Sequence, residues 1–202
     1  MEIQITQDLV QKKSITPNDA GCLQYIEDFL TQRGFINETL TFGRVKNLWS
    51  VKRNNGPLLV FLGHVDVVPT GPENEWEHDP FSGYDDGTFI NGRGTGDMKG
   101  GIACFMSALS RIDVDSLNYS IGFLITADEE GPSKDGTVKV VEELLQRDEK
   151  IDFCLIGEPS TLETVGDNIR IGRRGSINIE LEVLGKQGHA AYPARVDNPI
   201  HK

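Results

Sequence analysis

The sequence predicts an α/β fold with a central sheet that is largely parallel. Three apolar runs are separated by stretches with helical periodicity, and the first of them is continuous, which is typical of a strand buried on both faces. The strands are expected at residues 58–62, 121–127 and 153–156, and the helices at about 98–112 and 136–147. Alternation of strands and helices along a chain is the pattern of α/β proteins. A length of 202 residues is enough for one packed domain and the beginning of a second.

Three further features are expected in the first half of the chain. Thr16-Pro17, followed by an apolar face and then Gly34, predicts a helix with its N-cap at Thr16 and its stop at Gly34. The apolar face of this helix consists of Leu23, Ile26, Phe29 and Leu30. A strand is expected at 47–52, and a long loop with a short hairpin at 69–96, which is rich in Gly, Pro, Asp and Asn. Loops of this length in compact domains are usually functional.

The pattern of the chain changes after Arg174. Apolar residues from Ile177 to Val183 alternate with polar ones, which predicts a strand with one face in water. We interpret this strand as the first of a different, antiparallel domain. The predicted domains are therefore 1–174 and 175–202, the second of which is only begun.

Composition and charge exclude several classes of partner. The formal net charge is −11, and no block of Lys and Arg could neutralise a row of phosphates, so nucleic acid is not expected as a partner. The N-terminus lacks a secretory signal, and no run approaches the roughly 20 apolar residues of a membrane span. We therefore expect a soluble, cytoplasmic protein without a membrane partner. Cys22, Cys104 and Cys154 have apolar neighbours and are expected to be reduced core residues.

Polar side chains follow each of the three apolar strands. His64 and Asp66 come after the first, Glu129 and Glu130 after the second, and Glu158 after the third. Ligands of open α/β sheets bind beyond the carboxyl ends of the strands, so these side chains are expected to converge and could hold a metal. Taken singly, each has an ordinary explanation as a local hydrogen-bonding group or as part of a solvated acidic turn.

Spacing gives some of these residues a more specific interpretation. His64 and Asp66 are two residues apart on extended backbone and share a face, so Asp66 could hold the imidazole from behind. The segment 92–100 is rich in Gly, but Asp97 stands where a dinucleotide fingerprint needs a third Gly, and no Gly-Lys-Ser/Thr is present. Asp97 is either the N-cap of the next helix or a carboxylate that a glycine-rich turn presents to a cation. The carboxylates of residues 128–130 repel one another, and a divalent cation would offset that repulsion.

Six segments of the chain carry a resemblance to a known family. They are GHVDVVP (63–69), NGRGTGDMKGG (91–101), ITADEEGPSKDGT (125–137), IGEPS (156–160), GRRGS (172–176) and GKQGHAAYP (185–193). In this order they resemble the dinuclear zinc metallopeptidases and deacylases, the family that includes aminoacylases, glutamate carboxypeptidase, acetylornithine deacetylase and succinyl-diaminopimelate desuccinylase. DEEGP, GEPS, GRRGS and QGHAAYP favour the desuccinylase branch. The alternatives are acetylornithine deacetylase or an aminoacylase, and a metal-poor relative that serves as a binding module.

The resemblance implies a three-layer sandwich with a mostly parallel central sheet, the zinc-peptidase-like catalytic domain, followed by the start of a smaller α+β lid and dimerisation domain. It also implies two Zn²⁺ ions, for which Co²⁺ or Mn²⁺ may substitute. Their implied ligands are His64 and Glu158 on one ion, Glu130 on the other, and Asp97 on both. Glu129 would be the general acid/base, and Asp66 would support His64.

The implied reaction is hydrolysis of an acyl-amino acid by metal-activated water. In the desuccinylase branch it removes succinate from N-succinyl-LL-2,6-diaminopimelate, in lysine and diaminopimelate biosynthesis. By resemblance, the protein would be a homodimer joined through its lid, with His189 reaching the active site of the partner subunit to stabilise the oxyanion. Arg173, Ser176 and Tyr192 would contact the substrate. The family takes a last zinc ligand from a later segment, so the 202 residues alone are expected to bind at most one zinc well and to be nearly inactive.

Overall fold

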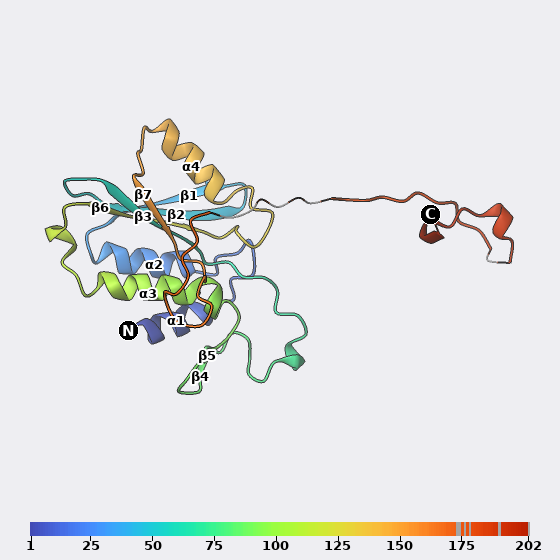
Figure 1. Cartoon of the computed structure of the whole chain (residues 1–202), viewed down its shortest axis with the longest axis horizontal. Helices are drawn as coiled ribbons and strands as arrows, with labels where there is room; N and C mark the ends of the chain where they lie inside the picture. Colours follow the sequence, from blue (N-terminus) through green and yellow to red (C-terminus); the bar gives the residue numbers. More distant parts are fainter. Residues whose placement is uncertain (173–174, 176, 178, 190, 202) are drawn as a thin grey trace. The chain divides into compact units, whose positions relative to one another are not determined.

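The computed structural model describes residues 1–172, 175, 177, 179–189 and 191–201 (Figure 1). The chain divides into two compact units, Met1–Pro159 and Ser160–Lys202. Within the described residues, the first unit holds both β-sheets and all four α-helices. The predicted domain boundary between residues 174 and 175 stays a prediction.

The first unit is built on a five-stranded sheet with the order β1-β2-β6-β3-β7. Its strands are β1 (Ile36–Phe42), β2 (Val45–Lys52), β3 (Leu58–His64), β6 (Ser120–Thr126) and β7 (Phe153–Ile156). Strands β6, β3 and β7 are parallel, whereas β1 and β2 form an antiparallel edge. The three strands predicted from apolar runs are therefore the parallel ones, and the predicted fold class is confirmed. Strand β1 was not predicted.

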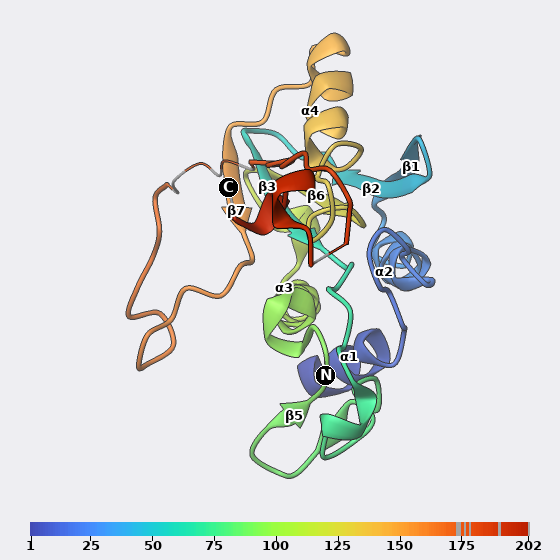
Figure 2. The same cartoon turned by 90° about the vertical axis from the view of Figure 1, so that its right-hand side faces the viewer.

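Helices cover both faces of this sheet, which gives three layers (Figures 1 and 2). Helices α1 (Glu2–Val10), α2 (Cys22–Thr31) and α3 (Gly100–Leu109) lie on one face, and α4 (Thr137–Gln146) lies on the other. Two separate apolar cores match these layers. The larger core joins α1, α2 and α3 to the sheet, and the smaller core packs α4 against it.

The prediction for the start of the second helix was wrong. Helix α2 begins at Cys22, after Gly21 in a left-handed conformation (φ 83°), and not near Pro17. The reason is that the Thr16 N–H donates to the backbone oxygen of Val67 at 3.0 Å, as part of a short pairing that includes Ile15 and Val67. The expected apolar face is nevertheless buried, because Leu23, Ile26 and Leu30 are all in the larger core. Helix α1 was not predicted.

The remaining predictions for the first unit fall close to the observed elements. The long loop contains the short hairpin β4 (Tyr84–Asp85) and β5 (Ile90–Asn91), and α4 lies within the predicted 136–147. The helix expected at 98–112 is shorter, because an irregular turn at Thr95–Lys99 precedes α3. Short 3₁₀ turns occur at Glu73–Glu75 and Val114–Ser116.

The strand expected from Ile177 to Val183 does not form in the described residues of that stretch. A strand needs a neighbour for its backbone hydrogen bonds. In the described part of the second unit, the only pairing is an isolated bridge between Lys186 and Asp197. This unit otherwise contains 3₁₀ turns at Pro193–Arg195 and Pro199–His201.

All three cysteines are free, as predicted, but only Cys22 is buried. Cys104 and Cys154 are exposed, so their assignment to the core was wrong. Cys154 lies on β7, which pairs with β3 on one side and is exposed along its whole length. As for membrane spans, no described helix combines the length and the apolar character that crossing a bilayer requires.

Glu2 links α1 to α3. Its carboxylate accepts hydrogen bonds from the Ser107 hydroxyl at 2.7 Å and from Arg111 at 2.9 Å. Hydrogen bonds from its own backbone N–H and from Ser107, with the nearby N-terminal ammonium and Arg111, lower the pKa of Glu2 to about 2.

We expect Glu2→Gln to remove an acid-dependent part of the stability. Because the pKa of Glu2 in the folded protein lies below its ordinary value of 4.5, its contribution is complete above that pH and is lost as the pH falls towards 2. Urea unfolding of both proteins across the acid range should show a difference in unfolding free energy that shrinks with falling pH. Glu75→Gln, an exposed substitution in the loop after β3, is the control, and a difference that does not change with pH would contradict the expectation.

Candidate metal centre

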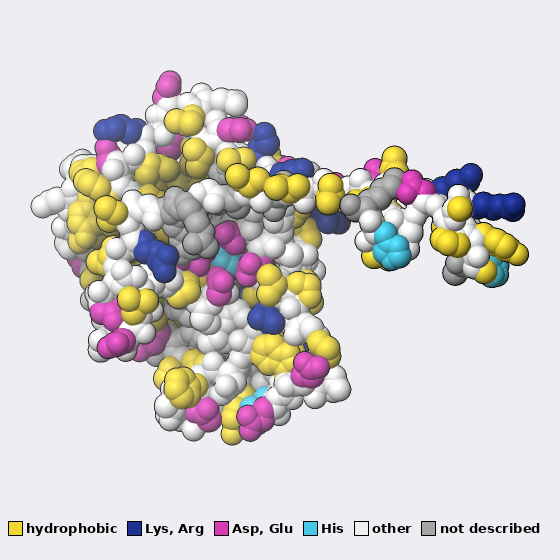
Figure 3. All heavy atoms as spheres, turned by 45° about the vertical axis from the view of Figure 1, so that its right-hand side comes forward, with side chains coloured by type: hydrophobic (Ala, Val, Ile, Leu, Met, Phe, Trp, Pro, Cys, Tyr) yellow, Lys and Arg dark blue, Asp and Glu magenta, His cyan; other side chains and the backbone are white. Residues whose placement is uncertain are grey.

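Three strand ends bring the candidate ligands to one edge of the sheet. His64 is the last residue of β3, and it pairs in register with Thr126 at the end of β6. The last pair of β3 and β7 is Leu62 with Ile156, two positions before His64. Both strands that neighbour β3 therefore end close to its end. Glu129, Glu130 and Glu158 lie just beyond these ends. Figure 3 shows acidic side chains gathered around a histidine on this part of the surface.

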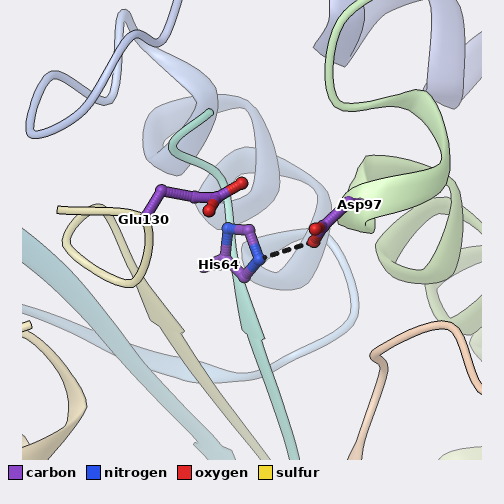
Figure 4. Close-up of side chains that lie close together, drawn as sticks. All are labelled: His64, Asp97 and Glu130. Carbon is purple, nitrogen blue, oxygen red and sulfur yellow. Dashed lines mark hydrogen bonds and ion pairs between the residues drawn. The ribbon is translucent and has the colours of Figure 1, made fainter. Parts of the chain in front are cut away.

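The imidazole of His64 is buried, with 1% of the residue exposed. Its Nε2 atom lies 3.0 Å from Asp97 Oδ1, 3.4 Å from Glu158 Oε1 and 4.0 Å from Glu129 Oε2. Its Nδ1 atom lies 2.9 Å from the backbone oxygen of Asp66 and 3.5 Å from Asp66 Oδ1. One ring nitrogen is thus engaged by residue 66, and the other faces the carboxylates (Figure 4).

Asp66 is completely buried and holds two parts of the site together. Besides facing His64, its carboxylate accepts hydrogen bonds from the backbone N–H groups of Glu129, at 3.2 Å, and Glu130, at 3.1 Å. Burial alone would raise the pKa of Asp66, but the hydrogen bonds from His64 and from the Glu129 N–H lower it. The carboxylate is therefore ionised where it fixes both the imidazole and the turn that follows β6.

Asp97 reaches the cluster from the irregular turn Thr95–Lys99. Its backbone is extended (φ −120°, ψ 96°), and its side chain is 55% exposed. Helix α3 has no side-chain cap, so the N-cap interpretation of Asp97 does not hold. The turn needs glycine at Gly94, which has a positive φ of 80° and where a Cβ atom would lie 2.3 Å from Val67 Cγ1.

Two groups of three residues place their ligand atoms within 4.8 Å of one another. One group is His64, Asp97 and Glu130 (Figure 4), and the other is His64, Glu129 and Glu158. All four predicted metal ligands lie in this cluster. How they divide between two ions stays a prediction.

The electrostatics of the cluster fit a bound cation. Burial first, and neighbouring carboxylates next, raise the pKa values of Glu129 and Glu130. Although burial disfavours an imidazolium, hydrogen bonds with Asp66 and Glu158 raise the pKa of His64 to about 11. The carboxylates thus need a positive charge among them, and one imidazole nitrogen with several carboxylate oxygens is a donor set that Zn²⁺ accepts.

The other predicted site residues lie outside the described residues or in the second unit. Arg173 and Ser176 lie outside the described residues. His189 and Tyr192 belong to the second unit, where their rings are 5.7 Å apart and the Ala191 N–H donates to His189 Nδ1 at 3.1 Å. Their roles stay predictions.

Sequence reasoning missed that Asp128 has a structural role, unlike Glu129 and Glu130. This residue is 4% exposed, and its carboxylate accepts hydrogen bonds from the backbone N–H groups of Ser133, Lys134 and Asp135. These hydrogen bonds close the turn after β6, and Glu129 and Glu130 lie within that turn. An Asp before a stretch rich in Gly, Pro and Ser is a recognised turn signal and could have indicated this role.

Comparison with protein families decides the identity of the fold. The family model described as Peptidase family M20/M25/M40 matches residues 60–202. The chain belongs to this peptidase family. Among curated relatives, succinyl-diaminopimelate desuccinylase of Hydrogenovibrio crunogenus is 52% identical over 98% of this chain and 53% of the relative. The enzyme of the same name from Marinobacter nauticus is 51% identical over 98% of this chain and 54% of the relative.

The chain therefore spans about half the length of the curated relatives it matches. Two solved structures show the same fold. Human carnosine dipeptidase 1 superposes with a TM-score of 0.70 at 20% identity, over 79% of this chain and 38% of that chain. A metallo-carboxypeptidase from Sulfolobus solfataricus gives a TM-score of 0.67 at 21% identity, over 79% and 37%.

We expect Asp66→Asn to weaken both the fold and metal binding. The amide has one acceptor oxygen where the carboxylate has two, so its NH₂ group must face either the backbone N–H groups or His64 Nδ1, which should lower the unfolding free energy by about 1–3 kcal/mol. Loss of the group that orients a histidine ligand should weaken Zn²⁺ binding by about 10–100-fold. Urea unfolding and calorimetric titration with Zn²⁺ measure the two effects. Asp28→Asn, on the exposed side of α2, is the control, and equal Zn²⁺ affinity in the two variants would refute a supporting role for Asp66.

Proposed function

We propose that this chain carries the metal-binding part of an amide hydrolase that removes succinate from N-succinyl-LL-2,6-diaminopimelate. The observation that supports this most directly is the cluster of His64 with carboxylates from the ends of β3, β6 and β7 and from the turn before α3. The branch is supported by 45–52% identity to relatives named succinyl-diaminopimelate desuccinylase.

The proposed ligands are His64, Asp97, Glu130 and Glu158, for Zn²⁺ or, in substitution, Co²⁺ or Mn²⁺. When bound, such cations polarise a carbonyl group and lower the pKa of water towards neutrality. Asp66 keeps the imidazole in the orientation that leaves Nε2 free to bind.

Glu129 is the proposed general acid/base. Its side chain is 51% exposed at the mouth of the cluster, and its Oε2 atom lies 4.0 Å from His64 Nε2. Burial and the neighbouring carboxylates raise its pKa, which brings it nearer to the working pH of a proton-transfer group. Glu129 would take a proton from the attacking water and return it to the leaving amine.

We also propose that the 202 residues bind only one Zn²⁺ tightly. Both groups of candidate ligands depend on His64, and its Nδ1 atom is engaged by Asp66, so a single nitrogen is available to a single ion. Among the residues of this cluster, a second ion would have only oxygen ligands. The chain as it stands would therefore turn over its substrate very slowly.

Zinc titration tests this stoichiometry. We expect one tight site in the 202-residue chain, and at least about tenfold weaker binding in Asp97→Ala, which loses a ligand oxygen. The control is Asp86→Ala in the exposed loop between β4 and β5. Two equally tight sites, or no effect of Asp97→Ala, would contradict the proposal.

Catalysis is tested in a polypeptide in which the remaining part of the Hydrogenovibrio crunogenus relative follows Lys202. We expect hydrolysis of the N-succinyl substrate to exceed that of N-acetylornithine, and Glu129→Gln to lower kcat by about 10²–10⁴-fold. Glu142→Gln on α4 is the matched control. Faster hydrolysis of the acetyl substrate would reject the desuccinylase assignment while retaining an amide hydrolase.

The remaining predictions belong to the same proposal. His189 would stabilise the oxyanion, and Arg173, Ser176 and Tyr192 would bind the substrate. A homodimer formed through residues from 175 onward, and a cytoplasmic location, complete it. Sedimentation of the extended polypeptide tests for the homodimer, and cell fractionation tests the cytoplasmic location.

A further inference from the structure

Lys99 is a buried lysine that the proposed chemistry does not use. The residue has an exposed fraction of 0%, and within the described part of the chain it forms no ion pair. Lysine is almost never fully buried without a partner, because removing its polar head from water is costly. Its Nζ atom instead donates hydrogen bonds to the backbone oxygens of Leu9, at 2.9 Å, and Lys12, at 3.1 Å.

Leu9 lies in the last turn of α1, and Lys12 lies two residues after the end of this helix. The last carbonyl groups of a helix have no partner within the helix, and they carry the negative end of its dipole. Lys99 therefore caps α1 from another part of the chain. The cap fastens the turn Thr95–Lys99 to α1, and α1 lies along α3 in both views of the fold (Figures 1 and 2).

The segment after α1 is joined to the other side of the metal cluster. The Ser14 hydroxyl donates to the backbone oxygen of Val65 at 2.6 Å, and the Val67 N–H donates to the backbone oxygen of Ser14 at 2.9 Å. Val65 and Val67 flank Asp66. Residues 9–16 therefore contact both the turn that carries Asp97 and the segment that carries Asp66.

Asp97 itself depends on this anchoring. Its side chain is half exposed, whereas the two residues after it are buried and hydrogen-bonded to neighbouring segments. Met98 is 1% exposed, and its sulfur lies 3.3 Å from the backbone nitrogen of His64. The Lys99 N–H donates to the Gly94 oxygen at 3.0 Å and closes the turn. The position of the Asp97 carboxylate is thus set by where Met98 and Lys99 are held.

We infer that Lys99 is a positioning residue: by capping α1 it fixes the turn from which Asp97 reaches His64, and it thereby sets metal affinity without contacting the metal. The inference rests on the proposed role of Asp97 as a metal ligand. It also gives residues 9–16 a function in the site, because they connect the turn that carries Asp97 to the segment that carries Asp66. We call these residues the brace.

The test is Lys99→Met in the full 202-residue chain, which keeps most of the side-chain volume and removes the donor. Zn²⁺ affinity is measured by competition with a chromophoric chelator, and folding by circular dichroism. We expect binding about 10–100-fold weaker than in the wild type, the range for loss of a group that orients a ligand. Lys46→Met, which removes the same charge from an exposed position on β2, should bind Zn²⁺ as the wild type does.

A double-mutant cycle separates positioning from a general loss of structure. If Lys99 acts through Asp97, adding Lys99→Met to Asp97→Ala should weaken Zn²⁺ binding no further. A further loss of tenfold in the double variant would overturn the inference. So would wild-type affinity in a folded Lys99→Met protein, an outcome that leaves the proposed function standing. Absence of Zn²⁺ binding in the wild type would instead overturn the proposed function.

Lys99→Gln is the second variant, and it tests whether Lys99 positions Asp97 if Lys99→Met does not fold. Its amide keeps N–H donors but is one atom shorter, so it cannot span both carbonyl oxygens. We expect a folded protein with Zn²⁺ binding at least severalfold weaker than the wild type. Wild-type affinity in folded Lys99→Gln would overturn the inference.

Discussion

The contact between His64 and Asp66 is the one on which the site depends. Several carboxylates converge on a partly buried space, and they stay ionised together only if a positive charge lies among them. Hydrogen bonds with Asp66 and Glu158 raise the pKa of His64 to about 11, so the imidazolium supplies that charge. A metal ion would take over the same task, and it must displace the proton from Nε2 to do so. Asp66 would serve both states, because the contact that it makes with Nδ1 leaves Nε2 to the proton or to the metal.

Sheet topology determines which residues can take part. Strands β6, β3 and β7 are parallel, so their carboxyl ends lie at the same edge, and the residues that follow them meet there. Strand β2 is antiparallel to β6 and ends at the opposite edge, so it contributes no ligand. Asp97 is the exception, since it comes from a turn and not from a strand end. It therefore needs the separate anchoring that Lys99 and α1 provide.

This difference explains how much of the site could be predicted from the sequence. His64, Glu130 and Glu158 stand at or just after the ends of apolar strands, and a parallel sheet brings such ends together without further information. The brace formed by residues 9–16 could not be predicted, because its contacts are hydrogen bonds to backbone oxygens between segments that are distant in the sequence. The same contacts explain the misplaced start of α2: Thr16 pairs with Val67 instead of capping a helix. Similarly, alternation from Ile177 to Val183 predicts which residues share a face, but it does not provide the neighbouring strand that pairing requires.

Strand β7 is apolar, and burial was therefore expected, but the structure shows it exposed. This exposure affects how firmly Glu158 is held. An uninterrupted apolar strand is typical of a sheet interior, yet Phe153 is 61%, Leu155 50% and Ile156 56% exposed. The strand is joined to the sheet by its ladder with β3, which the Gly157 N–H extends by donating to the Leu62 oxygen at 3.1 Å. Glu158 follows directly on this least covered strand, whereas His64 ends a strand with a neighbour on each side. Packing therefore fixes His64 more firmly than Glu158, and a bound cation, which would bind both, would add a second connection between the ends of β3 and β7.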